Sequence, residues 1–308
     1  MVSVLKSTRE ARGYVLITIG SILWGTMGIL AKLSFEHGIL PETLIDLRLL
    51  ISFATLPVVL TSFDEDSFKI QRTDVLLFLI LGVFAIALQR ISYFYAVDLT
   101  TATVAAILFY TYPIFVTLSA SYFLKEKITS RVLLAIVLTF LGVALVVRVY
   151  DTSSLNVNLA GLIFGLLSSL LFALYFMITK KLRNRYGGWT LTLYGDGIGA
   201  LTLIPVISFS LPEITKFSLQ LWLLIFSIAW IPSLLAYLLY SYALKYVKAS
   251  KGSVLSVIEP FSAALFSTAL IGESLEKPQI IGIALALIGV VLLFQMGKAR
   301  SGREEKKR

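Results

Sequence analysis

Long apolar runs constrain the fold of this chain more than any other feature of its sequence. Each run has the length, about 17 to 25 residues, that a helix needs to cross the hydrocarbon core of a membrane. None alternates between apolar and polar residues, as the strands of a membrane barrel would. The ten runs cover residues 14–33, 43–62, 75–96, 101–123, 131–148, 158–179, 190–210, 219–243, 253–271 and 279–296. The sequence therefore predicts an all-α polytopic membrane protein with ten transmembrane helices.

The composition supports a membrane environment. Hydrophobic residues make up 57% of the chain and charged residues 15%, whereas soluble domains carry about 25% charged residues. The first run lacks a small-residue cleavage site, so we expect a retained helix and not a removed signal peptide. Cysteine is absent, which excludes disulfides and thiolate metal sites.

Lysine and arginine are distributed unevenly between the predicted helix ends. If the amino terminus is cytoplasmic, 21 of the 27 fall in cytoplasmic segments and three, Arg148, Lys216 and Lys277, fall in outer segments. The remaining three, Lys32, Arg48 and Arg90, lie in or at the edge of spans. The positive-inside rule then places both termini in the cytoplasm, with the chain in the cell membrane. We expect the basic tail "GKARSGREEKKR" to anchor this topology or to contact anionic lipids, and not to bind nucleic acid.

The second half of the chain repeats the first. Segment 102–147 aligns without a gap with segment 249–294, at a displacement of 147 residues. The aligned pairs are Pro113 with Pro260, Glu126 with Glu273, and Gly142 with Gly289. A displacement of 148 residues aligns the earlier helices, with Trp24 on Phe172, Lys32 on Lys180 and Pro57 on Pro205. The chain is therefore expected to contain two copies of a five-helix unit, at residues 1–150 and 151–308.

Five is an odd number, so the second unit must enter the membrane from the opposite side. Inverted repeats of this kind are typical of secondary transporters, whose substrate sites lie near the midplane between the halves. The sequence contains no phosphate-binding loop and no loop long enough to hold a nucleotide domain. We therefore expect transport that does not use ATP.

Two segments resemble a known family. These are "WGTMGILAKL" in the first run and "IEPFSAALFSTALIGESLEKPQIIGIALALIGVVLLF" near the end, together with a proline in the fourth helix of each unit. They are similar to the EamA family of the drug/metabolite transporter superfamily, and the resemblance covers nearly the whole chain. It implies a central cavity lined by helices one to four and six to nine, with helices five and ten at the side. It also implies export or uptake of small metabolites, often amino acids.

An intramembrane enzyme is the competing class. It would need a nucleophile with a base, or a set of metal ligands. The single histidine, His37, lies in the predicted outer turn "FEHGILP", where a solvated loop residue is the simpler interpretation. We therefore expect no catalytic residues, no metal and no cofactor.

Glu259 and Pro260 lie side by side in the ninth run. A charged side chain within a span costs about 2.5 to 3.5 kcal/mol to insert, so it usually faces a cavity or a partner. Pro260 removes a backbone donor and frees carbonyls about one turn earlier, near Ser256. Its aligned pair, Tyr112-Pro113, repeats this break with a phenol in place of the acid. We expect Glu259 and Tyr112 to line the pathway, although the prolines can also serve packing alone.

Further candidates for the cavity are charged or aromatic residues inside the predicted spans. Arg48 and Asp196 align at a displacement of 148 residues, with the arginine toward the outside and the aspartate toward the inside. Arg90 can line the cavity or extend to the membrane surface. The remaining candidates, whose side chains combine polar and aromatic groups, are Trp24, Gln89, Tyr93, Tyr237 and Tyr240.

These charges suit a zwitterion, with its carboxylate on guanidinium groups and its amine near Glu259. The sequence therefore favours the export of amino acids or related small metabolites. The alternative is an organic cation or hydrophobic drug, held by Glu259, Trp24 and the tyrosines. A membrane scaffold without transport would not need the buried charges. Proton coupling through Glu259 or Asp196 and facilitated diffusion both remain open.

Small residues recur on one face of the fifth and tenth runs. They are Ala135, Thr139 and Gly142 in one, and Gly282, Ala286 and Gly289 in the other. Such faces let helix backbones approach closely in a membrane. We expect the two helices to pack against each other within a monomer, or against a second copy in a homodimer.

Overall fold

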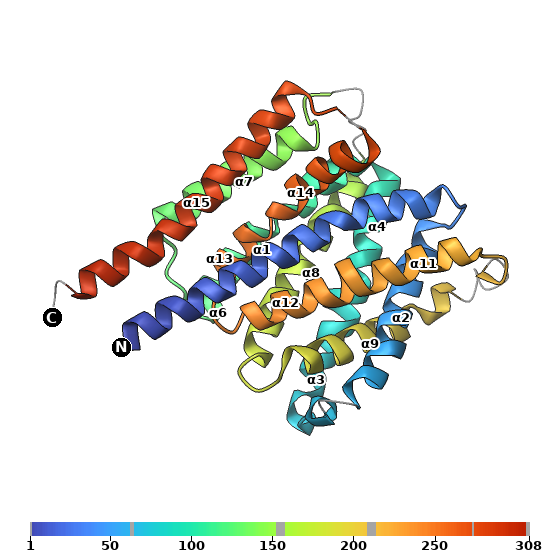
Figure 1. Ribbon diagram of the computed structural model, residues 1–308, viewed down its shortest axis with the longest axis horizontal. Helices are drawn as coiled ribbons and strands as arrows, with labels where there is room; N and C mark the ends of the chain where they lie inside the picture. The colour runs from blue at the N-terminus through green and yellow to red at the C-terminus, as the bar shows by residue number, and fades with distance from the viewer. Residues whose placement is uncertain (1, 62–64, 152–157, 208–213, 273, 306–308) are drawn as a thin grey trace.

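The computed structural model describes residues 2–61, 65–151, 158–207, 214–272 and 274–305, and every regular element within these ranges is helical (Figure 1). Two predicted runs end outside the described residues, at residue 62 and at residues 208–210. Glu273 and the side chains of the basic tail also lie outside them. The expected contact between this tail and anionic lipids therefore stays a prediction.

The described residues of the first half form seven α-helices, two 3₁₀-helices and one π-helical stretch. They are α1 (Val2–Phe35), α2 (Pro41–Leu60), η1 (Glu65–Phe68), η2 (Arg72–Asp74), α3 (Val75–Ile80), η3 (Leu81–Leu88), α4 (Gln89–Leu99), α5 (Ala102–Phe109), α6 (Tyr112–Phe123) and α7 (Ser130–Val146). Because η3 is a π-helical stretch, α3, η3 and α4 form one continuous helix.

The second half follows the same order. Its elements are α8 (Leu159–Leu182), α9 (Gly188–Ile207), α11 (Leu219–Ile228), η5 (Ala229–Leu235), α12 (Ala236–Ala243), α13 (Ala249–Leu255), α14 (Ile258–Phe266), η6 (Ser267–Ile271) and α15 (Lys277–Glu305). Again a π-helical stretch, η5, joins two α-helices, α11 and α12, into one.

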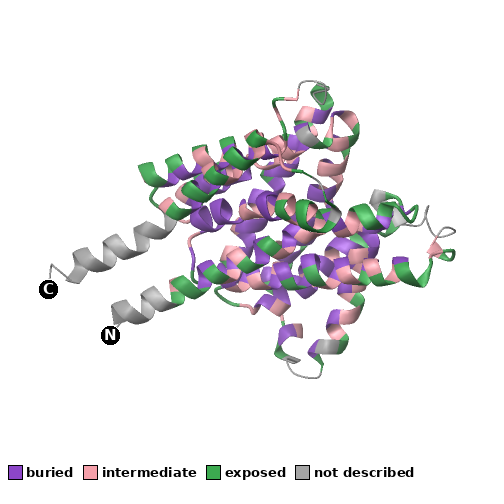
Figure 2. Cartoon of the chain, turned by 45° about the horizontal axis from the view of Figure 1, so that its top comes forward, coloured by how far each residue is buried: buried purple, intermediate pink, exposed green. Residues whose placement is uncertain are grey.

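Six helical stretches of the described chain are long and apolar enough to cross a membrane. They are Arg9–Phe35, Arg72–Leu99, Val104–Phe123, Leu159–Leu182, Leu219–Ala243 and Ala249–Leu270. Ser130–Val146 and Lys277–Leu292 are shorter apolar helices. Large apolar side chains such as Leu118, Leu159 and Leu219 are exposed on the outer faces of the bundle, while buried residues gather where helices meet (Figure 2). This is the surface of a multi-pass membrane protein.

The fourth and ninth predicted runs are each broken into two helices. α5 ends at Phe109 and α6 begins at Tyr112, just before Pro113. α13 ends at Leu255 and α14 begins at Ile258, just before Pro260. Hydroxyl groups within the breaks donate to carbonyls three residues earlier: Thr111 Oγ1 donates to Leu108 O at 2.6 Å, and Ser256 Oγ donates to Ser253 O at 2.9 Å. Leu108 O also accepts from Thr111 N at 3.2 Å.

The helices pack in pairs that lie far apart in the sequence. α1 packs against α12 and α14, α8 packs against α4 and α6, and α2 packs against α9. α7 and α15 lie side by side at the edge of the bundle, away from α2 and α9 (Figure 1). α1 begins and α15 ends on the same side of the molecule.

The contact between α7 and α15 runs along the small residues that the sequence singles out. A Cβ atom added to Gly142 would lie 2.6 Å from Gly282 O and 2.9 Å from the Ala286 Cβ. A Cβ atom on Gly289 would lie 3.0 Å from Ala135 O. The two backbones are therefore as close as glycine allows, and the helices pack against each other within one chain.

We predict that Gly142→Leu destabilises the protein, because the added side chain would meet the backbone of α15 and not a movable side chain. Overpacking of this kind costs about 1–3 kcal/mol or more. The melting temperature of the detergent-solubilised protein measures the effect. Val137→Leu, on the exposed face of α7, is the control and should melt like the native chain. A native melting temperature for Gly142→Leu, together with a changed substrate preference, would contradict the packing role.

Candidate functional site

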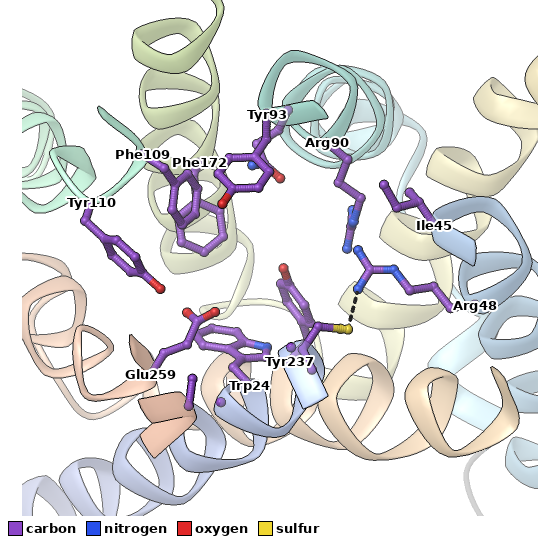
Figure 3. A pocket seen from close by; sticks show the side chains of 15 residues that line it. Trp24, Ile45, Arg48, Arg90, Tyr93, Phe109, Tyr110, Phe172, Tyr237 and Glu259 are labelled. Atoms are coloured by element: carbon purple, nitrogen blue, oxygen red, sulfur yellow. Dashed lines mark hydrogen bonds between the residues drawn. The ribbon is translucent and has the colours of Figure 1, made fainter. Parts of the chain in front are cut away.

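A cavity of about 370 Å³ lies inside the bundle, between α1, α2, α4, α5, α8, α12 and α14. We call it the central cavity. Its volume falls within the range of about 300–1,000 Å³ that is usual for small-molecule sites. Its walls combine three charged side chains with six aromatic rings (Figure 3). The charged residues are Arg48, Arg90 and Glu259, and the rings belong to Trp24, Tyr93, Phe109, Tyr110, Phe172 and Tyr237.

Glu259 reaches the central cavity from the first turn of α14. Its carboxylate has no hydrogen-bond or ion-pair partner among the described residues. Tyr93 and Tyr110 lie near enough to interact with it electrostatically. In Figure 3 Glu259 and Tyr110 lie on the side of the cavity away from the arginines. This side therefore presents an unpaired carboxyl group among aromatic rings.

Arg48 from α2 and Arg90 from α4 occupy the other side (Figure 3). Arg48 Nη1 donates to the sulfur of Met27 at 3.2 Å, and Arg90 Cζ lies 5.6 Å from the centre of the Tyr237 ring. The second distance is that of a cation–π contact. Among the described residues neither arginine forms an ion pair, so this side is positive.

Asp196, on α9, supplies a negative charge near the two arginines. It lies close enough to both to interact electrostatically, but it forms no ion pair with them within the described chain. Ser52 Oγ donates a hydrogen bond to its carboxylate at 3.2 Å. Asp196 therefore offsets part of the positive charge from behind the cavity wall.

Two buried donors in the cavity wall have no hydrogen-bond partner in the described part of the chain. They are the indole Nε1 of Trp24 and the Nε of Arg48. Buried polar groups are rarely left unpaired in folded proteins, and each exception requires an explanation. An acceptor on a bound molecule would provide one.

Seven of the ten predicted cavity residues line the central cavity. They are Trp24, Arg48, Gln89, Arg90, Tyr93, Tyr237 and Glu259. Arg90 is 6% exposed, so it faces the cavity and does not extend to the membrane surface. Gln89 Nε2 donates to Ser168 Oγ at 3.0 Å, which fixes its orientation.

The other three predicted residues lie behind the lining. Tyr112 is fully buried and shares a hydrogen bond of 2.8 Å with Ser256 Oγ. Tyr240 stacks on Trp24, with 5.1 Å between the ring centres. Asp196 borders a separate void of about 10 Å³ beside Tyr237. These residues support the walls and do not form their surface. Their side chains, on α6, α9 and α12, pack between helices.

The structure adds lining residues that the sequence did not single out. They are Gly25, Met27, Gly28, Ile45, Phe109, Tyr110, Phe172 and Ala263. Phe172 aligns with Trp24 at a displacement of 148 residues, so the repeat carried a signal for it. Tyr110 lies within the helix break before Pro113, where α5 ends. The others are apolar or small and carry no sequence signal of their own.

The central cavity continues toward one end of the bundle. A second cavity of about 560 Å³ shares Tyr93, Tyr110 and Ala263 with it and lies between α5 and α14. It extends to Arg148 and Glu276, which form an ion pair. We call this side the open end.

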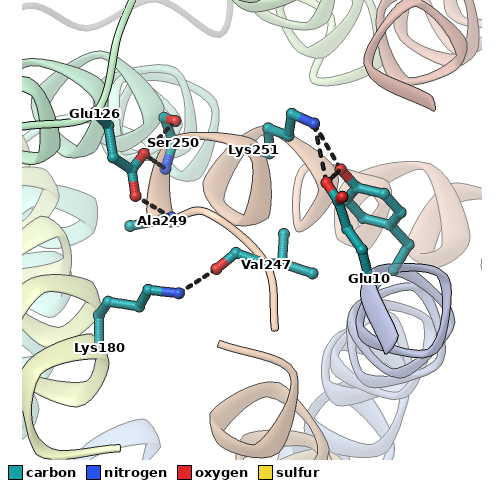
Figure 4. Close-up of polar contacts among 8 residues, drawn as sticks. Glu10, Glu126, Lys180, Val247, Ala249, Ser250 and Lys251 are labelled. Carbon is teal, nitrogen blue, oxygen red and sulfur yellow. Dashed lines mark hydrogen bonds and ion pairs between the residues drawn. The ribbon is translucent and has the colours of Figure 1, made fainter. Parts of the chain in front are cut away.

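The opposite end is closed. Here α6 packs against α13, and α6 and α13 align with α14 and α5 at a displacement of 147 residues. Polar contacts converge on residues 244–251 (Figure 4). The Glu126 carboxylate accepts hydrogen bonds from Ala249 N at 2.9 Å and from Ser250 Oγ at 2.6 Å. Lys180 donates to the carbonyls of Leu244 and Val247. Lys251 donates to the Glu10 carboxylate at 3.1 Å and to Tyr14 Oη at 2.8 Å. We call this set of contacts the latch.

An all-helical membrane protein with a charged internal cavity, open at one end and latched at the other, belongs structurally with membrane transporters. The comparisons agree. The sequence model of the EamA-like transporter family matches residues 11–148 and 159–295. The chain belongs to this family.

Curated relatives carry the same general description. The chain is 30% identical to an uncharacterized transporter of Archaeoglobus fulgidus, over 92% of this chain and 96% of that protein. It is 29% identical to the uncharacterized inner membrane transporter YicL of Salmonella typhimurium, over 93% and 96% of the two chains. A solved crystal structure shares the fold with a TM-score of 0.78 at 15% identity, over 94% of this chain and 98% of that one. The names of the two curated relatives describe transporters.

We predict that Asp196→Ala lowers stability, because it removes a negative charge that interacts with two guanidinium groups that have no ion-pair partner among the described residues. Removing one partner of a buried ion pair costs about 3–5 kcal/mol of stability. We expect a smaller loss of about 1–3 kcal/mol, because Asp196 forms no direct ion pair and the arginines also line the cavity. Ser52→Ala removes only the hydrogen bond and should cost less. Equal losses of melting temperature in the two variants would contradict the electrostatic role.

Proposed function

We propose that the protein is a secondary transporter that exports small zwitterionic metabolites such as amino acids, without ATP. The observation that carries this proposal is the presence of unpaired groups of both signs in one cavity of about 370 Å³. Arg48 and Arg90 suit a carboxylate, which can accept several hydrogen bonds from guanidinium groups. Glu259, among the tyrosines, suits an ammonium group.

The unpaired donors of the cavity wall support the same substrate class. The Trp24 indole and Arg48 Nε each lack an acceptor among the described residues, and a carboxylate offers about four acceptor positions. A substrate without an acceptor would leave both donors unpaired, at about 1–3 kcal/mol for each buried group. The cavity therefore favours molecules that carry an anionic oxygen.

The proposed architecture has ten transmembrane helices in two inverted repeats, residues 1–150 and 151–308, with both termini cytoplasmic. The two stretches matched by the family support this division, as does the parallel order of elements in both halves. α2 and α9 contain 20 residues each, which corresponds to about 30 Å of helix. Only the charge distribution supports the orientation.

The difference between the two ends supports alternating access. The latch closes one end, whereas the aligned helices α5 and α14 border the second cavity at the other. In the proposed cycle the latch opens while the gap between α5 and α14 closes, around a central cavity that stays in place. The pair α7 and α15 lies outside this movement. We propose a monomer, because α7 and α15 already cover each other's small residues.

Organic cations or hydrophobic drugs are the alternative substrates. The aromatic rings around Glu259 favour them, since rings and a carboxylate together bind cations well. The two arginines disfavour them, because a cation cannot offset two guanidinium groups. Transport of a quaternary amine without transport of any amino acid would select this alternative.

We predict that the purified protein in liposomes moves labelled amino acids without ATP, and that Glu259→Gln lowers this flux about tenfold or more. The expected loss corresponds to about 1.4 kcal/mol of interaction with the substrate amine. Glu36→Gln, which changes an exposed acid at the end of α1, is the control. Flux with and without an imposed proton gradient separates proton coupling from facilitated diffusion, and loaded liposomes of known orientation give the direction. Native flux in Glu259→Gln would remove the acid from the pathway.

We also predict that Glu126→Gln opens the closed end. The substitution replaces charge-assisted hydrogen bonds at the amino terminus of α13 with weaker neutral ones. The chain contains no cysteine, so Ser253→Cys, a fully buried position of α13, provides a single thiol for labelling. Its modification by a water-soluble reagent should become faster in the Glu126→Gln background. Lys127→Gln is the control, and equal rates in the two backgrounds would show that Glu126 does not hold this end closed.

A further inference from the structure

Two glycines of α1 line the central cavity, and they differ in what surrounds them. A Cβ atom on Gly25 would lie 2.1 Å from Ser262 Oγ and 2.9 Å from Ala263 N, so this glycine is required by the contact with α14. A Cβ atom on Gly28 would meet no atom within 4 Å. Gly28 is also exposed, although Trp24, one turn away, is buried. The absence of a side chain at Gly28 therefore leaves space that no neighbouring helix fills.

We propose that Gly28 determines how large a substrate the central cavity accepts. The inference rests on the proposed function and deepens it, since it assigns a size limit to the same site. Any other residue at position 28 would project its side chain from a cavity-lining position of α1 into open space. The volume available to a substrate would then decrease without disturbing a packed contact.

The charged groups of the cavity come from helices other than that of Gly28: Arg48 from α2, Arg90 from α4 and Glu259 from α14. Met27, the neighbour of Gly28 on α1, accepts a hydrogen bond from Arg48 Nη1 at 3.2 Å. A side chain at position 28 would therefore take up cavity volume without replacing any of the charged groups that bind the substrate.

Substitution at Gly28 should leave the fold intact. The residue lies within α1, with no positive φ angle that would require glycine. Alanine and leucine are better helix formers than glycine, and neither would clash at the first side-chain atom. A change in transport would therefore report on the cavity and not on unfolding.

The first test measures size selectivity in liposomes. The probes are serine and tryptophan, and, for the alternative substrate class, tetramethylammonium and tetraphenylphosphonium. Gly28→Leu should lower the flux of the larger member of the transported pair about tenfold or more relative to the smaller one. Gly28→Ala should give an intermediate ratio. Gly187→Leu is the matched control, because Gly187 also has open space around it but lies outside the cavity. Equal loss of both members in Gly28→Leu would overturn the inference.

The second test does not depend on transport. Because the chain lacks cysteine, Gly28→Cys carries a single thiol, and a positively charged methanethiosulfonate should modify it in the folded protein. Ile17→Cys, a fully buried position of the same helix, should not react. Failure of Gly28→Cys to react would overturn the inference.

The two tests separate the inference from the proposed function. If the native protein moves none of the four probes, the proposed function is wrong. The reactivity of Gly28→Cys toward methanethiosulfonates of increasing size then decides the inference alone. A size limit supports a restricted space at Gly28, and equal reactivity toward all sizes overturns it.

Discussion

The hydrocarbon core of a membrane cannot hydrate a charge, and this constraint determines where ionisable side chains can lie inside the bundle. Arg48, Arg90 and Glu259 are placed on three different helices, yet all three reach one cavity. Asp196 lies directly behind the arginines and is held by Ser52. Each charge costs about 2.5–3.5 kcal/mol to insert, so a chain that retains all four requires water, a partner or a substrate at that place.

The same constraint applies to the backbone. A helix break inside a membrane disturbs the backbone hydrogen bonds, and at each break a hydroxyl, of Thr111 or Ser256, donates to a carbonyl three residues earlier. Both breaks therefore combine a proline with a hydroxyl that bonds to the backbone. They also divide the helices that border the open and closed ends. α7, an unbroken helix without buried charge, packs instead against α15 at the edge of the bundle. This unbroken pair contacts the broken helices α13 and α14 from the edge of the bundle.

Much of the fold was predictable from the sequence, because apolar length and proline position act locally. The runs anticipated where helices form, but two of the ten are broken, and six helical stretches of the described chain are long and apolar enough to span a membrane. The small residues around Gly142 anticipated the contact between α7 and α15. For the candidate site, the charged residues predicted the cavity lining, because an ionisable group inside a span usually faces a cavity or a partner. The sequence could not separate Tyr237, which reaches the cavity, from Tyr240, which stacks on Trp24. That distinction depends on how α12 is rotated against α1, which is set by packing. The sequence did not mark Gly28 as a site residue, because it does not show that the space beside this glycine is left open.

The aligned positions of the two halves show where packing alone decides a residue and where chemistry does. Gly142 and Gly289 are identical, and both serve close contact between helices. By contrast, Arg48 aligns with Asp196, and Tyr112 aligns with Glu259. Two equal halves would enclose a cavity with the same chemistry at both sides. A zwitterion carries opposite charges at its two ends, so a site that binds one must depart from that equality. The departures bring arginine to one side of the cavity and a carboxyl group to the other, and this difference gives the cavity the polarity that the proposed zwitterionic substrate requires.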